Sequence, residues 1–204
     1  MGDIESHWQN IYESKDPTEV SWFEAVPRTS LDVIERFVHP HDSIIDIGAG
    51  ASRLVDHLLA DGFADVTVLD VSDAALTNTR QRLASATVKP TFVTADVTTW
   101  NPARTFDLWH DRAVFHFMTT EHMRGGYEAA MADAVRPGGV AVVATFADDG
   151  PEQCSGLSIV RYSESALAAQ FSDDFEVVES WRSAHTTPWG AEQRFVWVVL
   201  RRRA

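Results

Sequence analysis

Basic residues and cysteine are scarce in this chain. Its 204 residues hold 17 lysines and arginines against 30 aspartates and glutamates, which gives a net charge of −13. Such a surface repels a phosphate backbone, so DNA and RNA are disfavoured as partners. Lys15 and Lys89 are the only lysines, which argues against lysine-based catalysis, and the single cysteine, Cys154, excludes an internal disulfide.

Long apolar runs are missing as well. No stretch approaches the roughly 20 apolar residues that cross a bilayer, so we expect no membrane span. The segment Met1 to Glu5 is polar and acidic and lacks the basic and apolar regions of a signal peptide. Together with the unpaired cysteine, which suits a reducing compartment, these features predict a cytoplasmic protein.

Short strand-like stretches alternate with helical ones from Ser43 onward. The first strand is predicted at 43–47, followed by a glycine turn and a helix to about Leu59. A second strand at 66–70 precedes a helix that Ser72 caps and that runs to Leu83. Later elements are strands at 91–95, 106–110 and 140–146, a helix at about 120–135, a turn at 136–139 and a helix capped by Ser163. This rhythm predicts an α/β fold with a mostly parallel sheet and helices on both faces.

The C-terminal part breaks this rhythm. Residues 175–181 and 195–200 are two strand-like runs joined by a loop that carries residues 186–190, and they predict an antiparallel hairpin. The full expectation is a three-layer sandwich around a seven-stranded sheet, formed by residues 43–204. Residues 1–42 are rich in aromatics and are predicted to be a helical cap over the carboxyl edge of the sheet; simple packing against the sheet is the alternative.

Glycines and acids gather where three predicted strands end, the edge at which open α/β sheets bind ligands. Gly48 and Gly50 allow a tight turn close to a ligand, and Asp46 either fixes this loop or meets a ligand ammonium through water. Asp70 ends the second strand, where a carboxylate accepts from both ribose hydroxyls, and Asp96 follows the third, placed to accept from an adenine amino group. Each acid alone is equally explained as a turn or cap residue, but three at successive strand ends favour a nucleoside-containing cofactor.

With these motifs the chain resembles the class I S-adenosylmethionine-dependent methyltransferases, over about residues 43–200. The segments that carry the resemblance are Asp46–Gly50, Leu69–Asp70, Ala95–Val97, Phe106–Asp111 and Arg136–Gly139. The resemblance implies a Rossmann-like fold and S-adenosylmethionine as cofactor. It places the methionyl part at the Gly48–Ala49–Gly50 loop, the ribose at Asp70, and the adenine at Asp96 and Val97, with Asp46, Val71 and His110 as further cofactor contacts.

A nicotinamide-dependent oxidoreductase is the competing interpretation of the same fold. It would normally show Gly-x-Gly-x-x-Gly, but counting from Gly48 the third glycine position holds Arg53, and no Tyr-x-x-x-Lys pair is present. The methyltransferase family's frequent third glycine is replaced as well, by Ser52. The glycine loop is therefore weaker evidence than the three acids.

Methyl transfer requires an acceptor and a methyl group held in line, exclusion of water and, where needed, removal of a proton. His110 and Asp111 end the fourth strand, and with His116 they are the predicted catalytic residues, acting as base or acceptor orienter. The alternative is a His–Asp–Arg network that only braces the loop. Arg112 either binds an acceptor anion or pairs with Asp111, and we favour the pairing.

Aromatic and polar residues of the cap and of the later loops are the predicted acceptor contacts. These are Trp8, Tyr12, Trp22, Arg112, Cys154, Tyr162 and His185, the last expected in the hairpin loop. A covalent role of Cys154 is disfavoured because methyl transfer needs no enzyme adduct. No cysteine or histidine pair has metal-ligand spacing, so we expect no metal.

Three functions are compatible with these residues. A small acceptor methylated at oxygen, nitrogen or sulfur is the leading hypothesis. A protein lysine or terminus is the second, because His7-Trp8, Tyr12 and Ser21-Trp22-Phe23 look like the opening segment of a methyltransferase subgroup that includes protein-lysine enzymes, and an acidic surface attracts a basic target. A non-catalytic nucleotide-binding domain is the third, and turnover would distinguish it.

Overall fold

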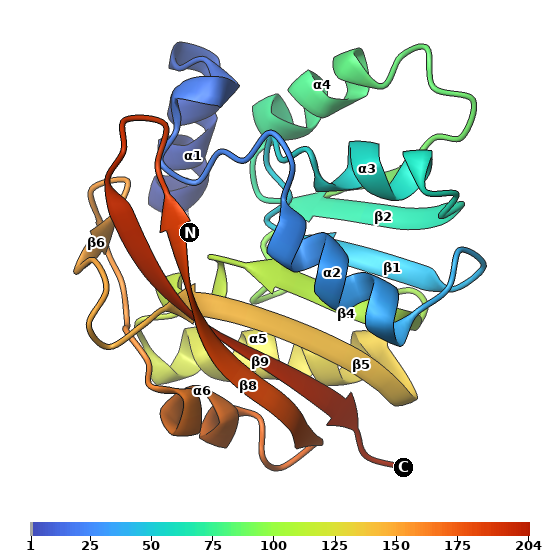
Figure 1. Ribbon diagram of the computed structural model, residues 1–204, viewed down its shortest axis with the longest axis vertical. Helices are drawn as coiled ribbons and strands as arrows, with labels where there is room; N and C mark the ends of the chain where they lie inside the picture. Colours follow the sequence, from blue (N-terminus) through green and yellow to red (C-terminus); the bar gives the residue numbers. More distant parts are fainter. Residues whose placement is uncertain (1) are drawn as a thin grey trace.

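A single twisted sheet forms the centre of the computed structural model, which describes residues 2–204 (Figure 1). Its strands are β1 (Ser43–Ile47), β2 (Asp65–Asp70), β3 (Thr91–Thr94), β4 (Phe106–Arg112), β5 (Val135–Phe146), β8 (Phe175–Thr186) and β9 (Glu192–Arg202). The order is β3-β2-β1-β4-β5-β9-β8, with β1 to β5 parallel and the β8–β9 hairpin antiparallel. The predicted seven-stranded sheet with its antiparallel C-terminal hairpin is confirmed.

Helices cover both faces of this sheet (Figure 1). One face packs α2 (Arg28–Phe37), α3 (Leu54–Ala60) and α4 (Asp73–Arg82), and the other packs α5 (Glu121–Ala134) and α6 (Glu164–Gln170). The central strand β1 is rich in isoleucine because it is buried on both faces: Ile44 enters the first core, while Ile45 and Ile47 enter the second. Ser72 caps α4 by accepting from the Ala75 amide, and Ser163 caps α6 in the same way, as predicted.

The segment before β1 contains two helices with different positions. Helix α1 (Gly2–Ser14) lies against α4, where the Gln9 side chain accepts from the Ser72 hydroxyl and the Ala74 amide. A short 3-10 turn, η1 (Pro17–Glu19), follows, and α2 then packs against α3 and β4. Thus α1 stands over the carboxyl edge of the sheet, while α2 belongs to one of its covering layers.

Several elements differ from their predicted bounds. The hairpin strands extend to Thr186 and start again at Glu192, because backbone pairing continues along the exposed edge strand β8 whether or not its side chains are apolar. The predicted turn at 136–139 lies inside β5, where the register against β4 shifts. The loop after β5 forms an unpredicted small hairpin, β6 (Gln153–Cys154) and β7 (Leu157–Ser158). Of the described helices, none has the length and apolarity needed to cross a bilayer.

Candidate active site

Two adjoining cavities lie at the carboxyl edge of the parallel strands. The larger, of about 900 Å³ with its open mouth, lies beneath α1, and the smaller, of about 560 Å³, lies on the α2 side. Both are lined by Trp22, Ile47, Gly48 and Arg112, so they form two parts of one site. This is the edge at which the sequence places its three acids.

The glycine loop after β1 approaches the cavity without side chains. Gly48 and Gly50 have φ values of +59° and +53°, in the left-handed region that favours glycine. A Cβ on Gly48 would collide with the Val114 side chain, and one on Gly50 would collide with the Tyr12 hydroxyl. Both glycines are therefore required by backbone shape and by close neighbours.

Asp70 ties the glycine loop to the start of α4. Its carboxylate accepts from the backbone amides of Gly50 and Ser72, each at 2.8 Å, and it lines the larger cavity. Burial, with a further contribution from the negative charge of Asp46, raises the pKa of Asp70 to about 6, although the amide hydrogen bonds act in the opposite direction. The Asp70 carboxylate therefore accepts hydrogen bonds from hydroxyl groups best above about pH 6, where it is ionised.

The walls beside Asp70 have the character of a nucleoside site. Asp96, Val97 and Val71 all line the larger cavity, and Asp96 is oriented by accepting from the Thr98 amide and hydroxyl at 2.9 and 2.7 Å. Met118, just before α5, and Met123, in the first turn of α5, add apolar surface that was not predicted from the sequence. Two carboxylates at neighbouring strand ends, apolar walls and a side-chain-free loop fit an adenosyl group.

His110 faces the smaller cavity and is held from both sides. Its Nδ1 lies 2.7 Å from Asp46 Oδ1 and its Nε2 lies 2.9 Å from Ser30 Oγ, and the residue is 2% exposed. Asp46 and Ala49 line the same cavity. Because both ring nitrogens have partners, the geometry fits a brace between β1, β4 and α2.

Asp111 lies on the opposite face of β4 and lines neither cavity. Its oxygens accept from the amides of Val114 and Phe115 and from the Tyr127 hydroxyl at 2.6 Å, which fixes the turn after β4. Burial raises the pKa of Asp111 to about 6. The predicted Arg112–Asp111 pair is wrong, because adjacent strand residues point to opposite faces; Arg112 instead pairs with Glu24 at 3.3 Å.

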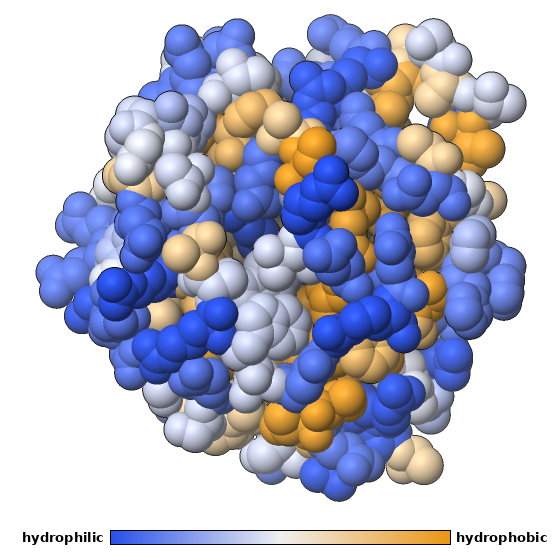
Figure 2. Space-filling model, viewed as in Figure 1, coloured by the Kyte–Doolittle hydropathy of each residue, from blue (hydrophilic) through white to orange (hydrophobic). Residues whose placement is uncertain are grey.

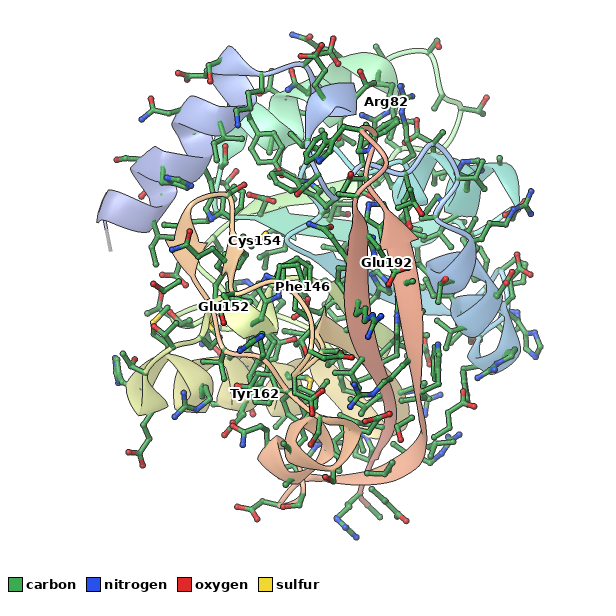
Figure 3. All side chains as sticks on the ribbon, turned by 60° about the vertical axis from the view of Figure 1, so that its left-hand side comes forward. Arg82, Phe146, Glu152, Cys154, Tyr162 and Glu192 are labelled. Atoms are coloured by element: carbon green, nitrogen blue, oxygen red, sulfur yellow. The ribbon has the colours of Figure 1, made fainter. Side chains whose placement is uncertain are left out.

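Two further predicted residues are buried away from the cavities. His116 accepts a long hydrogen bond of 3.4 Å from the Phe146 amide, and burial together with the charge of Arg112 lowers its pKa to about 3. The ring is therefore neutral at physiological pH. Tyr162 (labelled in Figure 3) is 5% exposed and also lines neither cavity.

Aromatic rings of the N-terminal segment roof the larger cavity. The ring centroid of Trp8 lies 5.6 Å from that of Trp22 and 5.3 Å from that of Phe117, while Tyr12 packs on Trp22 at 6.4 Å. Cys154 reaches the same cavity from the β6–β7 hairpin (Figure 3). Burial raises the pKa of its thiol to about 12, so it is uncharged and unreactive at neutral pH.

Glu24 joins the roof to the sheet in a cluster that we call the clasp, formed by Glu24, His185 and Arg112. His185 lies in β8 and not in the predicted loop; its ring contacts Glu24 Oε1 at 3.0 Å and the Ser21 carbonyl at 2.7 Å. Burial raises the pKa of Glu24, but the His185 hydrogen bond and the Arg112 charge outweigh it, and the net pKa is lowered.

Replacing His185 by leucine is expected to loosen segment 20–24. The change removes the ring's contacts to the Glu24 carboxylate and to the Ser21 carbonyl, and a hydrogen bond to a charged group stabilises by about 1.5–3 kcal/mol. Amide hydrogen exchange in residues 18–26 should therefore accelerate by about tenfold or more, as measured by mass spectrometry. The exposed His41→Leu variant is the control, and unchanged protection in both variants would show that the clasp does not hold the roof.

Metal-ligating side chains do not gather at this site. Within residues 2–204, no three histidine, cysteine, aspartate or glutamate side chains are grouped so as to hold an ion.

Comparison with known proteins connects this site to one family. Residues 44–139 match the sequence model described as "Methyltransferase domain". The mouse eEF1A lysine and N-terminal methyltransferase is 22% identical to this chain over 116 residues, which are 56% of this chain and 16% of the mouse protein. The malonyl-[acyl-carrier protein] O-methyltransferase of Anoxybacillus flavithermus is 30% identical over 89 residues, which are 43% of this chain and 33% of that protein. The chain thus spans about a sixth and a third of these two relatives.

A solved structure shares the fold over the full chain. The 1,6-didemethyltoxoflavin-N1-methyltransferase of Burkholderia thailandensis, with bound 1,6-didemethyltoxoflavin and S-adenosylhomocysteine, superimposes with a TM-score of 0.74 at 18% identity, covering 100% of this chain and 87% of that one. The matched residues 44–139 contain the glycine loop and the acids Asp70 and Asp96. Residues 44–139 therefore match the methyltransferase domain family, and the chain has the class I, Rossmann-like fold of S-adenosylmethionine-dependent methyltransferases.

Proposed function

We propose that this chain transfers the methyl group of S-adenosylmethionine to a small-molecule acceptor at oxygen, nitrogen or sulfur. The observation that carries the proposal is the roof over the larger cavity. Trp8, Tyr12 and Trp22 pack edge to face above the strand ends, and Cys154 contributes from the side. Such a roof encloses a small apolar or aromatic acceptor better than an extended polypeptide.

Each part of the site has an assigned task in this proposal. The bound cofactor supplies an electrophilic methyl carbon. Asp70 accepts from the ribose hydroxyls, Asp96 and Val97 hold the adenine, and the Gly48–Gly50 loop admits the methionyl part. The aromatic roof excludes water and orients the acceptor, so that proximity makes the main contribution to rate.

Proton removal is assigned to no side chain of β4. His110 has both ring nitrogens engaged, and Asp111 is used by the turn that follows it. We therefore assign His110 and Asp111 positioning roles. An acceptor that is nucleophilic in its neutral form or already ionised at neutral pH fits this site best.

A protein acceptor is the second candidate. It is supported by the similarity to the mouse protein named for lysine and N-terminal methylation and by the net charge of −13, which attracts basic targets. Figure 2 shows a largely hydrophilic face on which hydrophobic residues occur in small groups. Beyond that similarity, the support for a protein acceptor is electrostatic and comes from the acidic net charge.

An acceptor screen separates the two candidates. The chain is incubated with S-adenosylmethionine and either the small-molecule filtrate or the protein fraction of a cell extract, and released S-adenosylhomocysteine is quantified by mass spectrometry. We expect release with the filtrate, absent in the Gly48→Ala variant. Release with the protein fraction alone, accompanied by methylated protein, would refute the small-molecule assignment.

A further inference from the structure

The geometry points to Arg112 as the receptor of a carboxylate where the two cavities meet. This inference rests on the proposed function and deepens it, because it assigns a carboxylate group to the ligand of that site. Arg112 lines both cavities and stands at the end of β4 beside the cofactor-binding strand β1. No other arginine lines either cavity within the described residues.

The guanidinium is buried yet poorly satisfied. Its side chain is 12% exposed, and of its five N–H donors one hydrogen bond is made, from Nη1 to the Trp22 carbonyl at 3.1 Å. Nη2 lies 3.3 Å from Glu24 Oε1 but makes no hydrogen bond, and Cζ lies 4.9 Å over the Phe195 ring. Buried donors of a charged group are costly when unpaired, so an incoming anion that accepts from them gains strongly.

The surrounding charges limit what that anion is. Glu24 already faces the guanidinium, and Asp46 and Asp70 line the adjoining walls. The acidic surroundings repel a dianionic phosphate more strongly than a carboxylate, which carries one negative charge. The planar, two-oxygen carboxylate also matches the planar fork of a guanidinium.

Two molecules can bring this carboxylate. One is the amino-acid end of the cofactor, and the other is an acidic group on the methyl acceptor. Arg112 lines both cavities, so it can contact a carboxylate on either molecule. The chemistry is the same in either case, and the experiment has one arm for each source.

The first arm compares S-adenosylhomocysteine with 5′-methylthioadenosine, which lacks the amino-acid end, by calorimetric titration. The second arm titrates the S-adenosylhomocysteine-loaded protein with benzoate and with the neutral isostere benzamide. Arg112→Gln is the test variant, and the exposed Arg104→Gln, at the opposite end of the sheet, is the control. Because Arg112→Gln removes the guanidinium partner of Glu24, the Glu24→Gln/Arg112→Gln double variant guards against misfolding, with thermal unfolding as its check.

We expect the binding affinity of Arg112→Gln, and of the double variant, to fall by about tenfold or more in one arm only. If affinity falls for S-adenosylhomocysteine but not for 5′-methylthioadenosine, Arg112 binds the carboxylate of the cofactor. If the preference for benzoate over benzamide is lost, Arg112 binds a carboxylate of the acceptor. Folded variants that match wild type within about twofold in both arms would overturn the inference. Wild-type protein that binds neither nucleoside would instead refute the proposed function itself, which keeps the two failures distinct.

Discussion

Replacing Asp70 by asparagine is expected to weaken S-adenosylhomocysteine binding by about 10- to 100-fold. Asp70 is the acceptor that the structure offers at the end of β2, and each hydrogen bond to a charged group contributes about 1.5–3 kcal/mol. Asparagine keeps the size of the side chain but loses the charge and one acceptor oxygen. Isothermal titration calorimetry of wild type and variant measures the difference directly.

The pH dependence gives this prediction a second readout. Since burial raises the pKa of Asp70 to about 6, wild-type affinity should fall as pH drops below that value, while the asparagine variant should show no such fall. The stability effect has the opposite sign. A carboxyl whose pKa is raised on folding stabilises the native state at low pH, and this contribution is lost as pH rises from about 4 to about 6. The variant should therefore remain folded at neutral pH.

Asp73→Asn is the matched control for this test. Asp73 follows three residues later in the first turn of α4, is exposed and pairs with Arg80, and it lines neither cavity. Its replacement should change affinity by less than about twofold, as is usual for an exposed ion pair. Equal loss of affinity in both variants would contradict the assignment of the ribose to Asp70.

Replacing Gly48 by alanine is expected to be the most damaging single change. The left-handed conformation costs an alanine about 1–2 kcal/mol, and the new Cβ collides with Val114, for which overpacking adds about 1–3 kcal/mol. The loop would shift, and both stability and cofactor affinity should fall together. Denaturant unfolding and the same calorimetric titration measure the two effects.

Two companion variants separate backbone strain from the collision. Val114→Ala in the Gly48→Ala background removes the colliding methyl groups and should recover part of the lost stability. Gly190→Ala places alanine at φ +85° in the hairpin loop, where nothing lies within 4 Å of the new Cβ, so only the conformational cost of about 1 kcal/mol is expected. Failure of Val114→Ala to restore any stability would contradict the steric explanation.

The sheet and its ligand edge could be predicted because their signals are local. A strand buried on both faces needs apolar residues on both, as Ile44, Ile45 and Ile47 provide, and the turn after it needs Gly48 and Gly50. The parallel order then brings the ends of β1, β2 and β3 to one edge, so three acids far apart in sequence meet there. Cys154, Trp8, Tyr12 and Trp22 were also predicted to contact the site, and they line the larger cavity.

The polar contacts between distant segments were not predictable from local pattern. His110 meets Ser30, and His185 meets Glu24, across 80 and 161 positions in the chain. Such pairs depend on how α2 and segment 20–24 dock, which no spacing rule encodes. The Arg112–Asp111 pair, by contrast, is excluded by the strand period of two, which separates Asp111 from His110 and Arg112. Extending the fourth strand past His110 would have revealed this.

Calorimetric titration of the wild-type chain with S-adenosylhomocysteine and NAD in parallel tests the central claim most directly. We predict saturable binding of S-adenosylhomocysteine at one site and none of NAD, because the site offers Asp70, Asp96 and a glycine loop but holds Arg53 where the third glycine of a dinucleotide fingerprint would stand. Binding of NAD without S-adenosylhomocysteine would contradict the account.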